Sequence, residues 1–463
     1  MEPNLGESYW SLANLKTFRF AAEHVSCGYG SYVLDNAGQP INPTQYINGK
    51  DGYRQQSHEL RISGSPTRHV RYVGGVFLSQ ASHDIEQKYF INGLARSLSV
   101  TGSPSTWWLT EQVRTDRDYA AFGELTYDLT PRLSVTGGLR LFKYKNSLRG
   151  FFGFGLTHPF SSTGEQSCFA PSSVPGAPCT DVNKTVSDTG RTLKLNLTYH
   201  VDDDHMLYAT HSKGFRPGGI NRRGTLPPYV ADFLTNYEIG WKTSWVDHRL
   251  RFNGAAFVQD WKDFQFSFLG QNSFTQIANA GNARIKGVEA ELNWAATRSL
   301  TISGAFALLQ ARLTQAYCGT LGANGKDLNP CPMTRTTPQA PNGTDLPVTP
   351  RFKGNLIARY GFNLGAFDAH VQGAAVYVGE RWPDLRIAQR GILGREAAYT
   401  LADFTAGIEK SSYSIELLVN NVFDKRAQLD RWAQCDAAVC GVAGTYITPA
   451  QPRTIGIKFG QKF

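Results

Sequence analysis

The sequence lacks any long apolar stretch. Within its 463 residues, no window approaches the ~18 consecutive apolar residues that a membrane-spanning helix needs. Charged residues make up only 18% of the chain, and the mean hydropathy is −0.32. These values exclude a helical membrane protein. They do not exclude a membrane β-barrel, because its strands alternate lipid-facing and lumen-facing side chains and average near neutral hydropathy.

Signatures of catalysis are also missing. The sequence has no H-E-x-x-H, no G-x-S-x-G and no P-loop, and Gly153-Phe154-Gly155 does not lie in a strand–turn–helix setting. The acidic turn Asp202-Asp203-Asp204 between His200 and His205 is interpreted as a solvated turn rather than a cation site. We therefore expect no enzyme activity, no cofactor and no metal site.

The net charge is +9, but no basic cluster is interleaved with aromatic residues, so we do not expect nucleic-acid binding. Scattered loop and lumen charge is the simpler explanation of this excess. Attraction to an anionic ligand or to anionic lipid is the alternative.

The N-terminal residues Met1-Glu2-Pro3-Asn4 are followed by neither a basic nor an apolar region, so we expect no secretory signal in this chain. If the protein is exported, as argued below, we expect that the start of the gene is missing or that its start codon is misassigned.

Cysteines are few, at seven, and six of them form close pairs in loops rich in Pro, Gly or Ala. The pairs are Cys168 with Cys179, Cys318 with Cys331, and Cys435 with Cys440. The C-x2-C spacing of zinc sites is absent, which favours disulfides formed in an oxidising compartment over metal ligation. Cys27 is left over.

What the sequence does contain is alternation with a period of two. In residues 193–199, Leu or Tyr occupies every second position and polar residues lie between them, after which 201–204 form a short polar turn. About fifteen such strands follow from His58 onward, and residues 9–20 supply one more. Long loops at 150–187, 317–349 and 424–448 alternate with the short turns. This asymmetry predicts an all-β, antiparallel, up-and-down transmembrane barrel with short periplasmic turns and long extracellular loops.

Aromatic and polar residues fit the two faces of such a wall. Rings cluster at strand ends beside short turns, where a membrane interface favours them, although ordinary sheet packing is the alternative. These rings are Tyr199, Trp241, Trp245, Trp294 and Tyr360. Polar residues share faces that a wet lumen could accommodate and a packed core could not. They are Glu289, Glu291 and Asn293, and Asp403, Thr405 and Glu409.

The last strand ends the chain on an aromatic residue. Ile455, Ile457, Phe459 and Phe463 share one face. An amphipathic strand closed by a terminal aromatic resembles the signal that outer-membrane barrels present to the barrel-assembly machinery.

Five segments, in order along the chain, resemble motifs of TonB-dependent receptors. Ser57-His58-Glu59-Leu60-Arg61 resembles the S-(H/Q)-E-L-R strand, and Ser212–Asn221 resembles S-K-G-F-R-P-G-G-x-N. Asn236–Lys242 is similar to N-Y-E-x-G-x-K, Asn279–Glu289 to N-A-G-x-A-x-x-x-G-x-E, and Asn420–Lys425 to N-N-L-F-D-K.

The resemblance implies a barrel of ~22 strands with a plugged lumen. This chain supplies about sixteen of those strands, with residues 1–55 as a remnant strand and extracellular loop and 56–463 as the C-terminal portion of the barrel. The plug domain and the TonB box are not found, so we expect a truncated receptor.

The family imports scarce ligands, most often ferric siderophores, and in a full-length form engages the TonB complex. A Gram-negative outer-membrane location, in contact with its lipid, is therefore expected. A passive porin and an outer-membrane barrel enzyme are the alternatives.

Ligand contacts are expected in loops, where arginines beside aromatic residues suit an anionic ligand. The candidates are Phe215, Arg216, Asn221, Arg222, Arg223, Trp382, Arg386, Arg390, Arg431 and Trp432. The alternative is that these side chains hold the loops together through hydrogen bonds and cation–π contacts.

Overall fold

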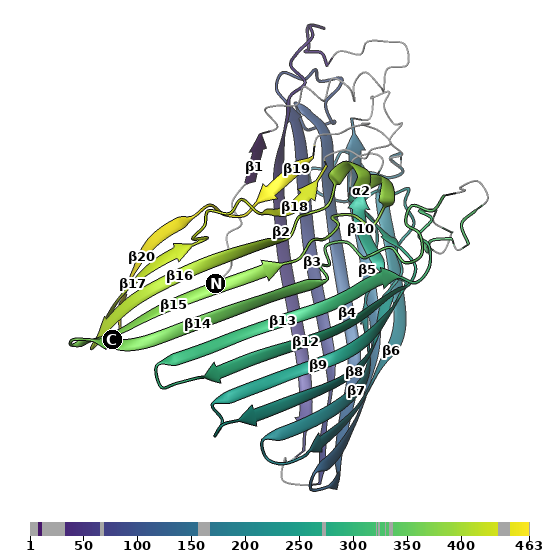
Figure 1. Ribbon diagram of the computed structural model, residues 1–463. Coiled ribbons are helices and arrows are strands. Elements are labelled where there is room, and N and C mark those ends of the chain that lie inside the picture. Colours follow the sequence, from purple (N-terminus) through teal and green to yellow (C-terminus); the bar gives the residue numbers. More distant parts are fainter. Residues whose placement is uncertain are drawn as a thin grey trace.

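A computed structural model of the chain describes one large antiparallel sheet and the loops above it (Figure 1). The residues described are 8–11, 33–64, 69–155, 167–270, 275–320, 322, 325–328, 330–332, 337–433 and 445–462. The sheet has 16 strands, and its neighbours follow the order of the chain. The predicted strand count and the up-and-down arrangement are confirmed.

The first strands of the sheet are long. After the short β1 (Ser8–Ser11) come β2 (Gln45–Ser63), β3 (Val70–Ile91), β4 (Thr106–Thr130), β5 (Leu133–Phe154) and β6 (Val182–His200). With 19 to 25 residues each, β2 to β6 are about twice the ~9–11 residues that a tilted strand needs to cross a bilayer. The predicted boundary at residue 55 falls inside β2, and the division of the chain there stays a prediction.

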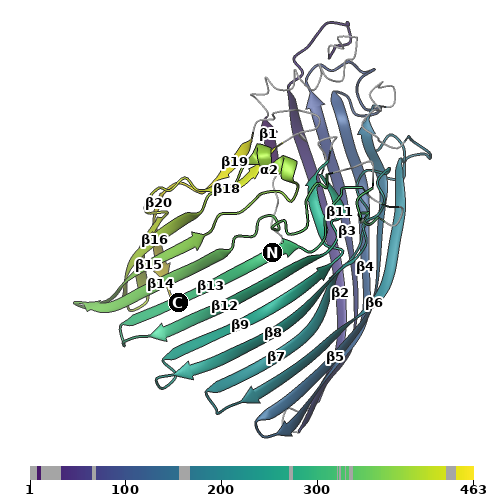
Figure 2. The same ribbon diagram turned by 45° about the vertical axis from the view of Figure 1, so that its right-hand side comes forward.

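The remaining strands have 8 to 14 residues. They are β7 (His205–Arg216), β8 (Asp232–Trp245), β9 (Leu250–Lys262), β12 (Ala283–Ala295), β13 (Leu300–Leu313), β14 (Phe352–Leu364), β15 (Phe367–Val378), β16 (Tyr399–Lys410), β17 (Tyr413–Asn420) and β20 (Thr454–Gln461). Figure 2 shows the two sets as one curved wall, in which the long strands rise above the short ones.

In the part of the chain that is described, the sheet has two open edges, formed by β1 and β20. There, β1 pairs only with β2, and β20 pairs only with β17. Closure into a barrel is therefore not seen among these strands.

Turn length differs sharply between the two ends of the strands, as predicted. Residues 131–132 and 201–204 are examples of the short connections, all of which lie at one end of the wall (the turn end). Long connections lie at the other end (the loop end), and they contain smaller elements of their own. These are the hairpin β10 (Gln265–Leu269) with β11 (Thr275–Asn279), the helix α2 (Ile387–Leu393), and the hairpin β18 (Gln428–Trp432) with β19 (Tyr446–Pro449). No helix in the described part of the chain is long and apolar enough to cross a membrane.

Alternation gives the sheet two unlike faces. On the outer face, apolar side chains are uncovered: Leu195 is 55% exposed, Ile239 68% and Phe459 74%. On the inner face, polar residues pair across strands, as when Lys194 Nζ donates to Glu124 Oε2 at 2.9 Å and Asn253 Nδ2 to Glu291 Oε1 at 2.8 Å. Ile455 and Ile457 of the last strand are also exposed, whereas Phe463 lies outside the described residues.

Buried apolar clusters gather toward the loop end. One joins Leu313, at the end of β13, to Phe264, Tyr317 and Leu385 from connections between the short strands. Another joins Leu148 and Val182 of the long strands to Ile220 of the connection between β7 and β8. Packed core therefore exists where loops meet the wall.

Two of the predicted disulfides are formed, and both close loops at the loop end. Cys168 is bonded to Cys179 and Cys318 to Cys331, with Cα–Cα distances of 5.9 and 5.3 Å. The predicted pair Cys435 and Cys440, like Cys27, lies outside the described residues.

Candidate functional site

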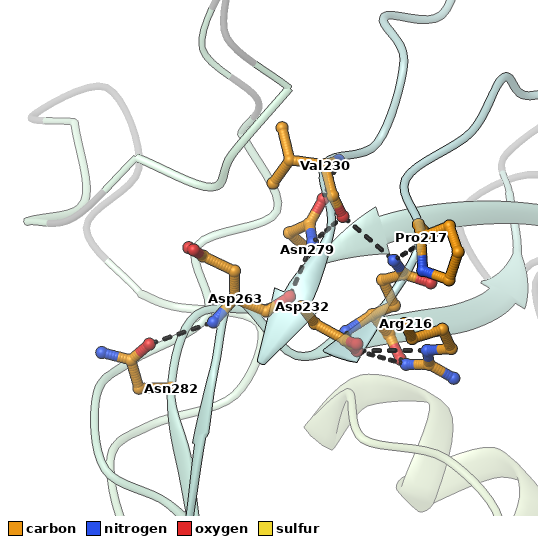
Figure 3. A network of polar contacts seen from close by, with 8 residues as sticks. Arg216, Pro217, Val230, Asp232, Asp263, Asn279 and Asn282 are labelled. Atoms are coloured by element: carbon orange, nitrogen blue, oxygen red, sulfur yellow. Dashed lines mark hydrogen bonds and ion pairs between the residues drawn. The ribbon is translucent and has the colours of Figure 1, made fainter. Parts of the chain in front are cut away.

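An ion pair at the loop end of β7 holds three elements together. Arg216 Nη2 donates to Asp232 Oδ2 at 2.6 Å and to the carbonyl oxygen of Gln265 at 2.9 Å, joining β7 to β8 and β10 (Figure 3). The Gln265 amide donates to the same Asp232 oxygen at 3.1 Å. Because the Asp232 side chain is only 2% exposed, it needs these donors, and Arg216 serves as its counter-ion. The Arg216 side chain is nevertheless 49% exposed and stacks over Trp261.

Asn279 and Asn221 fasten the β10–β11 hairpin to the connection between β7 and β8. The Val230 amide donates to Asn279 Oδ1 at 2.9 Å, and Asn279 Nδ2 donates back to the Val230 oxygen at 3.0 Å (Figure 3). Asn221 likewise both donates to and accepts from the backbone of Ile277. Buried amide side chains satisfy backbone groups here, so Asn221 holds structure in place and its side chain is not available to a ligand.

Phe215 is also part of the packing. Its ring stacks on Phe142 with centroids 3.5 Å apart and joins a cluster with Tyr144 and Phe233. Phe215 therefore helps to hold the structure together, which was the alternative to ligand binding in the sequence analysis.

Arg222 and Arg223 follow Asn221 and differ in what they contact. Arg222 is half-buried and donates from Nη1 to Gln87 Oε1 at 3.0 Å on the long strand β3. Arg223 Nε donates to Thr225 Oγ1 at 2.9 Å within its own loop.

Around α2, two further candidates are buried arginines whose donors are engaged. Arg386 pairs with Asp384 at 3.0 Å and reaches the Leu269 oxygen at 3.1 Å. Arg390 donates to the backbone oxygens of Asp384 and Asp345 at 2.8 and 2.5 Å. Both guanidinium groups donate to carbonyl oxygens of neighbouring loops, so these two arginines hold the loops together.

Trp382 remains partly accessible, with cations on its ring. Arg390 and Arg395 lie 5.2 and 4.7 Å from its centroid. Such contacts hold an aromatic ring in one orientation. Trp382 therefore offers a fixed aromatic surface with positive charge beside it.

A buried ion pair next to Trp382 escaped the sequence prediction. Arg381 and Glu396 lie 2.6 Å apart, with side chains 5% and 0% exposed. Burial raises the pKa of Glu396, and the positive charge of Arg381 opposes that shift. The only sequence signal was the adjacency of Arg381 to Trp382.

Arg431 and Trp432 reach the same place from the β18–β19 hairpin. The Arg431 amide donates to Glu396 Oε1 at 3.2 Å, and Arg431 Nη1 donates to the Arg395 oxygen at 3.2 Å. Trp432 is 41% exposed and stacks on Tyr446 at 4.8 Å.

Phe215 and Arg216 lie at the end of β7, and the other eight candidates fall into two groups at the loop end. One group lies around α2. It consists of Trp382, Arg386, Arg390, Arg431 and Trp432. Asn221, Arg222 and Arg223 lie on the connection between β7 and β8, against the long strands. Among the described residues, no group of three or more His, Cys, Asp or Glu side chains could hold a metal ion.

Known proteins share this sheet. A family model described as "TonB dependent receptor-like, beta-barrel" matches residues 4–422. The chain belongs to this family. Its members are outer-membrane receptors, and the sheet of 16 strands with short turns at one end is the family's barrel wall.

Relatives in sequence are longer receptors. The pesticin receptor of Yersinia pestis is 24% identical over 425 residues, which cover 89% of this chain and 52% of the receptor. The metal-pseudopaline receptor CntO of Pseudomonas aeruginosa is 28% identical over 250 residues, covering 53% and 31%. The chain therefore spans about half the length of the pesticin receptor.

A solved structure has the same fold. The ferric yersiniabactin uptake receptor FyuA from Yersinia pestis superposes with a TM-score of 0.66 at 20% identity, over 92% of this chain and 56% of that one.

Proposed function

We propose that this chain forms the barrel wall and ligand-contacting loops of an outer-membrane receptor that imports a metal–siderophore complex with TonB. The observation that carries the proposal is the membership of the family, which spans residues 4–422. Relatives named for metal-pseudopaline and ferric yersiniabactin support the ligand class.

The loop end supplies chemistry that suits such a ligand. Trp382 and Trp432 present aromatic surface, and Arg216 keeps half its side chain in solvent. Siderophores carry carboxylate, phenolate or catecholate oxygens, which guanidinium groups bind through charge-assisted hydrogen bonds. Binding and transport, rather than catalysis, are proposed for this site.

The exposed apolar outer face supports the proposed location. Side chains such as Leu195 and Ile239 lie uncovered on strands whose inner faces are polar, and outer-membrane lipid is the proposed partner for that belt. The last strand, with Ile455, Ile457 and Phe459 exposed, is proposed to be recognised by the barrel-assembly machinery.

Uptake measurements test the proposal. The gene, with any coding sequence contiguous with it, would be expressed in a Gram-negative host lacking its own siderophore receptors and supplied with a panel of ⁵⁵Fe-siderophores. We expect uptake of at least one complex, and its loss when tonB is deleted. Uptake that persists without TonB would instead indicate a passive porin, and no uptake of any complex would remove the iron assignment.

A pair of variants locates the ligand contacts within that assay. Replacement of Trp382 by Ala removes the fixed aromatic surface, and we expect at least tenfold weaker uptake at limiting concentration. Replacement of Tyr413, an exposed aromatic at the turn end, is the matched control and should leave uptake unchanged.

A further inference from the structure

Two arginines from distant parts of the chain meet on the inner face of the long strands. Arg114 belongs to β4, and Arg222 to the connection between β7 and β8. Arg114 Nη2 donates to the Ile220 oxygen at 2.7 Å, and Gln112 Nε2, two residues earlier on the strand, donates to the Arg222 oxygen at 2.8 Å. These two hydrogen bonds attach the connection between β7 and β8 to β4. The guanidinium groups of Arg114 and Arg222 are then close enough for their charges to interact.

Neither guanidinium has a carboxylate partner. Both donate to neutral oxygens, of Ile220 and of Gln87, and in the described part of the chain neither lies within ion-pair distance of an acidic side chain. The acids that face this region make their direct contacts with other side chains: Asp51 with His83 at 2.8 Å, and Asp116 with Asn146. Half-buried cations are ordinarily paired, so two guanidinium groups without a direct ion pair leave positive charge that is only partly balanced, at longer range, by acids such as Asp51.

Unsatisfied polar atoms lie at the same place. Gln112 is fully buried, and its Oε1 accepts no hydrogen bond. Arg114 Nε is buried as well and donates none. Burial lowers the pKa of Arg222, and the like charge of Arg114 lowers it further, while Asp51, Tyr53 and Tyr89 act in the opposite direction. Arg114 Nε therefore lacks an acceptor and the two like charges repel each other, which indicates a place for an anion, whereas Gln112 Oε1 lacks a donor.

We propose that Arg114 and Arg222 form an anion-binding subsite for a carboxylate group on a ligand that enters from the loop end. Guanidinium groups match the planar geometry of carboxylates, which favours this class over a halide. The inner position favours a small molecule from the lumen over a lipid headgroup, because lipid meets the outer face. This inference deepens the proposed function and rests on it for the identity of the natural ligand.

Citrate, a tricarboxylate, is a direct probe. Isothermal titration calorimetry of the detergent-solubilised chain at low ionic strength should show citrate binding, and glycerol, its neutral counterpart, should show none. Raising the salt concentration should weaken binding, because it screens the charges. Arg222→Gln and Arg114→Gln should each weaken citrate binding at least tenfold. Arg191→Gln, which removes an exposed arginine on the outer face of β6, is the matched control and should bind citrate like the parent chain.

Arg222→Lys sharpens the test because it keeps the charge and removes the planar fork, so intermediate affinity is expected. Each variant is checked for heat-modifiable migration in gels, and Arg222→Gln decides if Arg114→Gln does not fold. Equal citrate binding by parent, Arg222→Gln and Arg191→Gln, or no binding by the parent, overturns the subsite. Citrate binding without siderophore uptake would reject the proposed function and leave the subsite standing.

Discussion

Strands β2 to β6 and the strands that follow them belong to one sheet, yet they build the loop end in different ways. The long strands carry 19 to 25 residues and continue far past the length that crosses a bilayer. Their own side chains, such as Arg114 and Gln112, therefore line the inner face there. The short strands stop early, and α2 and the two hairpins take over their position.

The difference is clearest where the two sets meet. β6 pairs with β5 from Val182 to Tyr199, but with β7 only from Lys194 to His200. Above Lys194, the connection between β7 and β8 replaces the missing strand, with Ile220 packed on Leu148 and Lys184 donating to the Leu226 oxygen at 3.1 Å. The connection between β7 and β8 thus packs against the long strands, whereas the loops of the short strands pack mainly against one another.

The largest effect is expected from the loop cluster of the short strands. Arg381→Ala leaves the buried carboxylate of Glu396 without its counter-ion and should cost about 3–5 kcal/mol of unfolding free energy. Denaturant titration in detergent micelles measures this. Arg54→Ala breaks an ion pair of the long strands, with Asp84, whose side chains are 77% and 44% exposed, and should cost only about 0–1 kcal/mol. Equal losses would contradict the comparison.

A smaller loss is expected at the junction of wall and loop. Leu148 is fully buried between Val182 and Ile220, so Leu148→Ala should cost about 2–5 kcal/mol through lost transfer energy and a cavity. Leu195→Ala is the control on the exposed outer face, where detergent or lipid fills the space and no cavity term arises. Losses of the same size at both positions would show that the outer face is covered by protein.

The sequence predicts features that depend on a local residue pattern better than features that depend on contacts between distant loops. Alternation along 193–199 predicted a strand correctly, because two different environments select residues at every second position. The roles of Arg386 and Arg390 could not be predicted this way. Their neighbour Trp382 suggested a ligand surface, but the oxygens of Leu269 and Asp345 that engage them come from loops far away in the chain.

Arg114 was missed for a related reason. It lies in a strand, where only alternation is visible, and its proximity to Arg222 depends on the loop that the Ile220 contact positions. Long-range contacts between loops leave no periodic trace in a sequence.

The smallest effect is the pH dependence that Glu111 of the long strands contributes. Glu111 lies in β4 toward the loop end, beyond the segment beside the short turn, and is opposite Glu86 in the register. Burial, followed by the charge of Glu86, raises its pKa from 4.5 to about 7. The folded state therefore holds this proton more tightly than the unfolded chain, so the contribution of Glu111 to stability is fully present below about pH 4.5 and is lost as pH rises through about 7.

Denaturation midpoints between pH 4 and 8 measure that dependence. Glu111→Gln cannot lose a proton and should flatten the fall, whereas Glu380→Gln, which changes an exposed carboxylate near the short strands, should retain it. An unchanged profile in Glu111→Gln would assign the pH dependence to other groups.

The alternation of the wall between lipid and water is the central claim, and spin-label accessibility along β6 tests it most directly. A genetically encoded nitroxide amino acid would be placed singly at 193 to 198 in the chain reconstituted in lipid vesicles. We expect 193, 195 and 197 to be accessible to oxygen dissolved in lipid, and 194, 196 and 198 to a water-soluble nickel chelate, with a period of two. Accessibility to the chelate alone at all six positions, or the same pattern on both faces, would contradict the account.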